Sequence, residues 1–228
     1  MAAPLLLAAA AWCLLPAAGS AQALEEIFTP DTPISRNGYR TWSLFLVCNP
    51  TWLVPRSEER LESLYYDFRG FGRVIGSDHL AVWFWREEPV WGTSELAEIV
   101  DVERSARYCE TLGLEQSRGP HIFITSSYPE LPAPDAGLEG FDPDSAFAER
   151  QVVELGAMEP GEISEFLARL SEQVVAEGVP EVAPDSESYW VTWFEAMRGT
   201  LVGFGERVRV TIQTSFFRIE LSGSDPSG

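Results

Sequence analysis

Residues 118–125 read Arg-Gly-Pro-His-Ile-Phe-Ile-Thr. A Gly-Pro turn opens this segment, and the apolar residues after it are typical of a short strand that is buried on both faces. Two earlier runs of the same kind, at 41–47 and 80–85, predict two more buried strands. A fourth strand is predicted at 151–155. We therefore expect a sheet whose inner strands are covered on both sides.

Helices are expected between these strands. Apolar residues recur at helical spacing from Leu61 onward, and Gly70 and Gly72 are expected to end this first helix. A second helix is predicted over about 102–112. A third, clearly amphipathic helix follows the Pro-Gly-Glu turn at 160–162.

The chain continues beyond this core. Trp190, Phe194, Met197 and Leu201 recur at helical spacing and predict a packed helix. Polar and apolar side chains alternate over 207–214, which predicts a half-buried strand.

The domain organisation follows from these elements. We expect a signal peptide at 1–23, an N-terminal segment at 24–40, a core domain at 41–178, a linker at 179–188 and a C-terminal helix-strand extension at 189–228. The core domain contains a long loop at 128–146 that is rich in Pro, Asp and Gly. A loop of this length is either functional or a flexible insertion.

The first 23 residues are typical of an export signal. An apolar run is followed by a small-x-small cleavage site that ends at Ala23. We therefore expect a secreted or periplasmic protein with no stable membrane insertion after cleavage. An uncleaved anchor is the alternative, although Pro16 and the short run suit a spanning helix poorly. Lipidation at Cys13 is a second alternative, although Trp12 occupies the position where a lipoprotein signal has a small residue.

The charge of the chain disfavours nucleic acid as a partner. The formal net charge is -19, and Lys is absent from the entire sequence. Phosphate backbones are bound by a basic face, which this composition does not provide. The acidity is more typical of a soluble surface than of an acidic recognition site.

Over about 41–176 the order of elements resembles the thioredoxin-like fold. The most specific similarity is Arg118-Gly119-Pro120-His121, which resembles the turn that carries the cis-proline of thioredoxins before their third core strand. Val153-Glu154-Leu155-Gly156, which leads into the last core helix, is a second similarity. The resemblance implies an α/β protein with a mixed sheet flanked by helices, in which the first two strands are parallel and the last two antiparallel. A flavodoxin-like fold or another α/β sandwich is the alternative.

The chain departs from this family at its catalytic motif. Where thioredoxins have Cys-x-x-Cys after the first core strand, this chain has Trp52-Leu53-Val54-Pro55. Dithiol exchange needs a low-pKa thiolate with a resolving thiol beside it, and neither is present in this segment. Ordinary thioredoxin or disulfide-isomerase activity is therefore not implied.

Cys48 and His121 are the candidate catalytic residues. If the resemblance holds, the loop after the first strand faces the Gly-Pro turn, and Cys48 approaches His121. A thiol beside an imidazole can act as a nucleophile or as a single-cysteine redox centre. Alternatively, both are inert core residues. Export would permit a disulfide between Cys48 and Cys109, and the sequence leaves open whether they are bonded.

The loop after the first strand and the Gly-Pro turn supply the candidate binding residues, which are Trp52, Pro120 and His121. We predict no metal and no cofactor, because the spacings of Cys48, His79, Cys109 and His121 match no zinc pattern and His79 is expected at the opposite strand end from Cys48. The acidic loop offers carboxylates for calcium but lacks the EF-hand order.

Trp83 and Trp85 are expected to point to one face of the sheet. We expect the C-terminal helix to cover this face. If no element covers it, it is a partner-binding patch.

These observations lead to a function hypothesis. We expect an exported thioredoxin-like protein without the dithiol motif, which is non-catalytic and binds a protein or peptide. The alternative is a single-cysteine oxidoreductase that uses Cys48 near His121. A small-molecule binding module is a third class that the sequence leaves open, as it does the oligomeric state.

Overall fold

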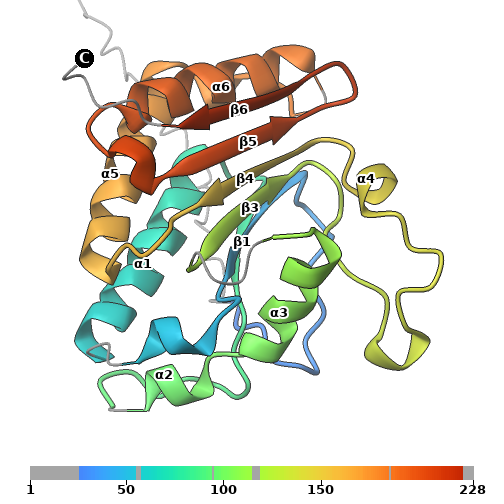
Figure 1. Cartoon of the computed structure of the whole chain (residues 1–228), viewed down its shortest axis with the longest axis vertical. Coiled ribbons are helices and arrows are strands. Elements are labelled where there is room, and N and C mark those ends of the chain that lie inside the picture. The colour runs from blue at the N-terminus through green and yellow to red at the C-terminus, as the bar shows by residue number, and fades with distance from the viewer. Residues whose placement is uncertain (1–25, 55–57, 94, 115–118, 185, 223–228) are drawn as a thin grey trace, which may run out of the picture.

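The computed structural model describes residues 26–54, 58–93, 95–114, 119–184 and 186–222 (Figure 1). It has a six-stranded mixed sheet flanked by helices, which confirms the predicted α/β class. The expected signal peptide with its cleavage site after Ala23 lies outside the described residues, as do Pro55 and Arg118.

The sheet joins the strands in the order β2-β1-β3-β4-β5-β6. The strands are β1 (Thr41–Leu46), β2 (His79–Trp83), β3 (His121–Thr125), β4 (Arg150–Glu154), β5 (Arg209–Gln213) and β6 (Arg218–Ser222). β1 and β2 are parallel, whereas β3 and β4 are antiparallel, and both arrangements were predicted. The half-buried strand predicted at 207–214 is β5. β6 was not predicted.

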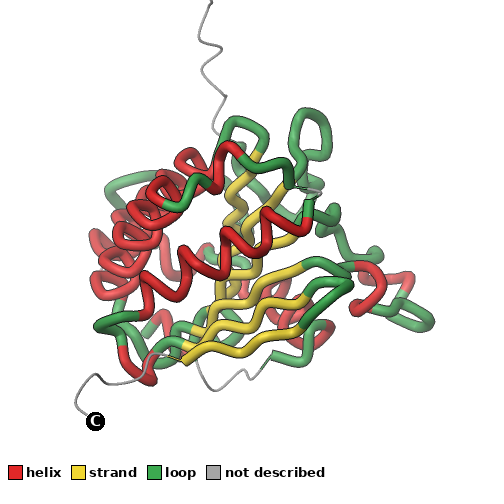
Figure 2. Tube along the Cα trace, turned by 90° about the horizontal axis from the view of Figure 1, so that it is seen from above, coloured by secondary structure: helices red, strands yellow, loops and turns green. Residues whose placement is uncertain are grey.

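Helices lie on both faces of the sheet, as Figure 2 shows from above. The helices are α1 (Glu58–Ile75), α2 (Leu96–Ile99), α3 (Val102–Thr111), α4 (Pro143–Ala146), α5 (Pro160–Ala176) and α6 (Glu187–Leu201). Short 3-10 turns are η1 (Pro50–Leu53), η3 (Pro134–Ala136), η4 (Val179–Glu181) and η5 (Gly205–Arg207). Among the described helices, none combines the length and the apolar character needed to cross a lipid bilayer.

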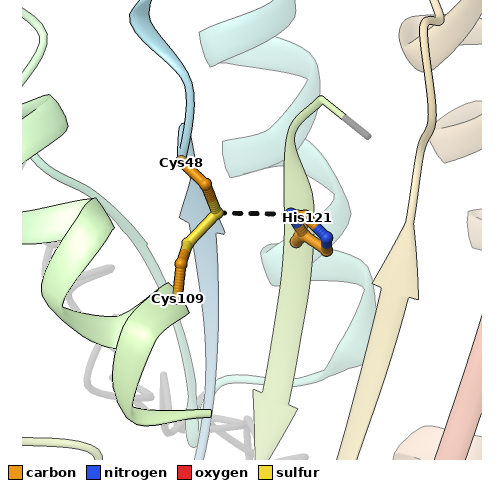
Figure 3. A group of neighbouring side chains, drawn as sticks. All are labelled: Cys48, Cys109 and His121. Carbon is orange, nitrogen blue, oxygen red and sulfur yellow. Dashed lines mark hydrogen bonds between the residues drawn. A yellow bond between two sulfur atoms is a disulfide. The ribbon is translucent and has the colours of Figure 1, made fainter. Parts of the chain in front are cut away.

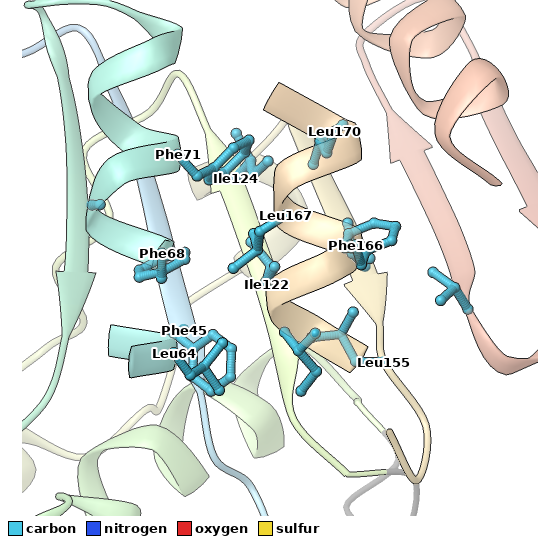
Figure 4. Packing of buried hydrophobic residues seen from close by; sticks show 14 of the residues in the cluster. Phe45, Leu64, Phe68, Phe71, Ile122, Ile124, Leu155, Phe166, Leu167 and Leu170 are labelled. Carbon is cyan, nitrogen blue, oxygen red and sulfur yellow. The ribbon is translucent and has the colours of Figure 1, made fainter. Parts of the chain in front are cut away.

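Two hydrophobic clusters hold these layers together, because successive side chains of a strand point to opposite faces. One cluster contains Phe45 of β1 and packs it under α1, α5 and α6. The other contains Leu44, Leu46 and Cys48 and packs them against α3. Figure 4 shows the first cluster, where α1 and α5 lie side by side over the sheet.

The expected end of the first helix at Gly70 and Gly72 is wrong, because α1 continues through both glycines to Ile75. Buried Phe71 and Ile75 extend its apolar face. A Cβ added at Gly72 would lie 2.6 Å from the Cβ of Ala81. Gly72 therefore allows α1 to approach β2 closely, and it does not terminate the helix.

The expectation that the C-terminal helix α6 covers Trp83 and Trp85 is also wrong. Both side chains point to one face, as predicted, and both are buried. However, Tyr65 of α1 contacts both rings, at centroid distances of 6.0 and 5.4 Å. α6 instead places Trp193 against Phe71 of α1. Since both tryptophans are buried, they do not form a partner-binding patch.

The C-terminal extension is continuous with the core. β5 pairs antiparallel with β4, and α6 packs against α5. Val208, Val210 and Ile212 point into the same cluster as α1 and α5. The extension therefore widens one sheet and one helical layer.

The two glycines of α1 allow a matched test of this packing. We expect Gly70→Ala to raise the free energy of unfolding by about 0.5–1 kcal/mol, because a Cβ there meets open space and alanine favours the helix. We expect Gly72→Ala to lower it by about 1–3 kcal/mol, because the added methyl overpacks Ala81. Urea denaturation measures both. Equal effects of the two substitutions would contradict the close approach of α1 to β2.

Candidate functional site

The pairing of β1 with β3 positions the first two candidate residues. Leu46 lies opposite His121 in this antiparallel register. Cys48 is two residues beyond Leu46, and side chains two apart share one face of a strand. Cys48 and His121 therefore meet at one end of the sheet, on the side that α3 covers.

The expected approach of Cys48 to His121 is present. Cys48 Sγ lies 3.3 Å from Nδ1 of His121 (Figure 3). Cys48 is also bonded to Cys109 of α3, with the two Cα atoms 6.0 Å apart. A second sulfur thus lies at this place, so Cys48 is not the lone thiol that the alternative of a single-cysteine centre assumed. The two cysteines are 61 residues apart in sequence, and only the packing of α3 on β1 brings them together.

All three side chains are almost completely buried. Their exposed fractions are 3% for Cys48 and 0% for Cys109 and His121. Disulfide exchange requires access of an attacking thiolate to a sulfur atom. A protein substrate therefore has no direct path to this disulfide in the described conformation.

Burial also determines the charge of His121. It lowers the pKa of the imidazole to about 4, although the backbone of Gly119 opposes this shift. The ring is therefore neutral at neutral pH. Because a disulfide sulfur carries no hydrogen, Nδ1 is the donor in the contact with Cys48. Within the described part of the chain, Nε2 has no hydrogen-bond partner.

The other histidine has a different environment. His79 begins β2 and lies opposite Thr41, which is the far end of β1 from Cys48, as predicted. Its Nδ1 lies 2.8 Å from Thr41 Oγ1, and its Nε2 lies 3.0 Å from Ser43 Oγ. Burial lowers its pKa to about 3. Since both ring nitrogens have hydrogen-bond partners, we assign His79 a structural role.

The predicted binding residues form a closed contact. Trp52 is 5% exposed, and its Nε1 donates to the carbonyl of Met158 at 3.0 Å. Pro120 is buried, and its carbonyl accepts from Leu155 N at 3.1 Å. A Cβ at Gly119 would lie 1.8 Å from the carbonyl oxygen of Gly156, so only glycine fits. The loop after β1 does meet the Gly-Pro turn, but Trp52, Pro120 and His121 present little surface to a ligand.

A groove that the sequence did not predict lies on the outer side of α3. Its volume is about 900 Å³, and three segments and Arg86 line it: 30–33, 101–107 and 130–134. The segment 130–134 belongs to the loop at 128–146. The unusual length of this loop was the only feature of the sequence that pointed to a functional surface here. We call this feature the α3 groove.

The group of Cys48, Cys109 and His121 has the composition of a metal site once the disulfide is reduced. The ligand atoms of Cys48, Cys109 and His121 lie within 4.8 Å of one another. Thiolate and imidazole are ligands for zinc and copper. The prediction of no metal depended on sequence spacing, which does not show that three distant residues converge.

The two buried histidines predict how stability depends on pH. Their folded pKa values are below the unfolded value of about 6.5, so their contribution is complete above pH 6.5 and is lost as pH falls toward 4. At pH 5 each should reduce the free energy of unfolding by about 2 kcal/mol. Because the chain has 2 histidines, His121→Gln should halve the loss between pH 7.5 and 5, as measured by urea denaturation. An unchanged loss would contradict the neutral buried imidazole.

Comparisons of this chain with known protein families, with curated proteins and with solved structures found no match. Its function is therefore derived from its own residues.

Proposed function

We propose that this chain is an exported, thioredoxin-like protein that binds a protein or peptide in the α3 groove and does not catalyse dithiol exchange. The observation that carries the proposal is a groove of about 900 Å³ whose three walls are tied together by charged side chains. Its size is within the range of ligand pockets, which is about 300–1,000 Å³.

Arg104 of α3 joins the walls of the groove. Its guanidinium donates to the carbonyls of Thr29 and Thr32 at 3.0 and 3.2 Å. It also pairs with Glu130 at 3.2 Å and lies over the ring of Phe84. One half-buried cation therefore connects the N-terminal segment, α3 and the long loop. A groove held in this way loses little conformational entropy when a ligand binds.

The disulfide supports the same wall. α3 presents Cys109 to the sheet, where it is bonded to Cys48, and presents Arg104 and Arg107 to the groove. Arg107 donates to the carbonyl of Pro132 at 2.6 Å. In this proposal the disulfide has a structural role, since it holds α3 against β1.

The exposed lining suits a polar, extended peptide. Asp31, Glu103 and Arg86 are exposed and offer charges of both signs. Pro30 and Pro134 stiffen the rims, because proline fixes its φ angle. Charges of both signs select the register and orientation of a bound segment more than they add affinity.

A selection of random peptides displayed on phage tests this proposal. We expect peptides enriched on the chain without residues 1–23 to lose at least tenfold in affinity for Arg86→Glu, because the substitution reverses an exposed charge of the groove. Arg198→Glu on α6 is the matched control, since Arg198 is exposed and does not line the groove. Isothermal titration calorimetry measures both. Absence of enrichment, or equal affinities for the two variants, would overturn the proposal.

One observation favours a second candidate function, a thiol-disulfide oxidoreductase. Cys48 Sγ lies 3.3 Å from the His121 imidazole and is bonded to Cys109. In this reaction a substrate dithiol is oxidised to a disulfide, and its two electrons and two protons convert Cys48 and Cys109 to thiols. In the reverse direction the two thiols reduce a substrate disulfide and are themselves reoxidised. The burial of both sulfurs is the argument against it.

Reduction of insulin by dithiothreitol distinguishes the two candidates. We expect the wild-type chain to leave the rate of insulin precipitation at the level of dithiothreitol alone, because its sulfurs are buried. A thioredoxin serves as the positive control. An acceleration that is lost in Cys48→Ser would establish the oxidoreductase instead.

A further inference from the structure

Two sulfur atoms and one imidazole converge where β1 ends, β3 begins and α3 crosses. We propose that the reduced protein binds one Cu(I) ion through Cys48, Cys109 and His121. Their ligand atoms lie within 4.8 Å of one another in the disulfide form. None of the three ligands lines the α3 groove, and the proposal does not depend on the proposed function.

The fold brings the three ligands together in the absence of a metal. The register of β1 and β3 places Cys48 beside His121, with Sγ and Nδ1 3.3 Å apart. α3 holds the Cα of Cys109 6.0 Å from that of Cys48. When the S–S bond is broken, side-chain rotation alone separates the two sulfurs so that both can contact one ion. Little backbone rearrangement is therefore required for binding.

The polar contacts of His121 indicate a role beyond packing. Nδ1 contacts Cys48, and the ring also has a hydrogen bond with the backbone of Gly119, but Nε2 has no partner within the described residues. A buried imidazole without full hydrogen bonding is unfavourable, and such groups are characteristic of sites for ions, water or redox chemistry. His79 is the contrast, since it is equally buried and uses both nitrogens.

The composition of the site favours Cu(I) over other cations. Thiolate sulfur is a soft ligand that selects Cu(I) or zinc over hard cations such as calcium and magnesium. Zinc is almost always four-coordinate. The candidate group contains three residues, with exposed fractions of 3, 0 and 0%, and this burial limits a water ligand. Cu(I) is satisfied by three ligands of the thiolate and imidazole type, so it matches this set.

The disulfide controls this site. In the oxidised form both sulfurs are shared in one bond and cannot act as thiolate ligands. An external dithiol or phosphine that breaks the bond supplies two electrons, and the sulfurs become thiols or thiolates. Binding of Cu(I) then displaces any remaining thiol protons to solvent. The ion and the disulfide therefore exclude each other.

Competition with bicinchoninate tests the proposal without oxygen. Protein without residues 1–23 is reduced with a phosphine, desalted and titrated into the coloured Cu(I)–bicinchoninate complex. We expect the reduced wild type to remove one equivalent of Cu(I), and the oxidised wild type to remove none. X-ray absorption of the loaded protein should show two sulfur ligands and one nitrogen ligand.

Substitutions assign the ligands. We expect Cys48→Ser and Cys109→Ser to weaken binding at least a hundredfold, and His121→Gln at least tenfold. His79→Gln is the matched control, because it changes the other buried imidazole and should bind as the wild type does. Tryptophan fluorescence of each reduced variant verifies that it is folded.

Thermal unfolding distinguishes binding to the folded protein from binding to the unfolded chain, because only the first raises the Tm. A folded site should raise the Tm of the reduced protein by roughly 10 °C when the ion is present at about a thousand times its Kd. A lower Tm with Cu(I), a His121→Gln variant that binds as the wild type does, or no transfer from bicinchoninate would each overturn the proposal. Preference for zinc over Cu(I) in the same competition would overturn the choice of ion.

Discussion

The antiparallel pairing of β1 with β3 is the constraint on which the candidate site depends. It places Leu46 opposite His121, so that Cys48 and the imidazole share one face of the sheet. A slip of one residue would turn one of them to the opposite face. The hydrophobic clusters on both faces prevent such a slip, because it would exchange the side chains that each cluster buries.

Close backbone approaches complete this arrangement, and glycine makes them possible. Gly72 allows α1 to lie against β2 at Ala81, and Gly119 allows the turn before β3 to lie against Gly156. Any side chain at Gly119 would collide with the carbonyl oxygen of Gly156. The close approach that glycine permits here brings the turn to the loop of Trp52. The same packing buries Trp52, Pro120 and His121, which were the predicted binding residues.

α3 contributes residues to both candidate sites, the Cys48–Cys109–His121 group and the α3 groove. Its inner face holds Cys109 at the disulfide, and its outer face holds Arg104 in the groove. Asp101 caps the helix by accepting from Arg104 N, so the residue that joins the groove walls also belongs to the first turn. The buried, neutral His121 and the exposed groove with charges of both signs therefore lie on opposite sides of α3.

Local pattern determined the elements of this protein. Apolar runs identified four strands, helical spacing identified α5 and α6, and alternation identified β5, because each pattern reports which side of an element is buried. The expectation that Gly70 and Gly72 end the first helix failed, because Phe71 and Ile75 continue its buried face and Gly72 is needed for the close contact with β2. β6 was not predicted, although Ile219 and Leu221 alternate with polar residues as the apolar residues of β5 do.

The sequence also led to the hypothesis that Cys48 approaches His121, which followed from the resemblance of its strand order and Gly-Pro turn to the thioredoxin-like fold. Only the tertiary structure decided that Cys109 joins them, which helix covers Trp83, and that the α3 groove exists. Each of these depends on how far and at what angle one element packs on another. No pattern within a single element encodes that distance, so residues 61 apart become neighbours only in the folded chain.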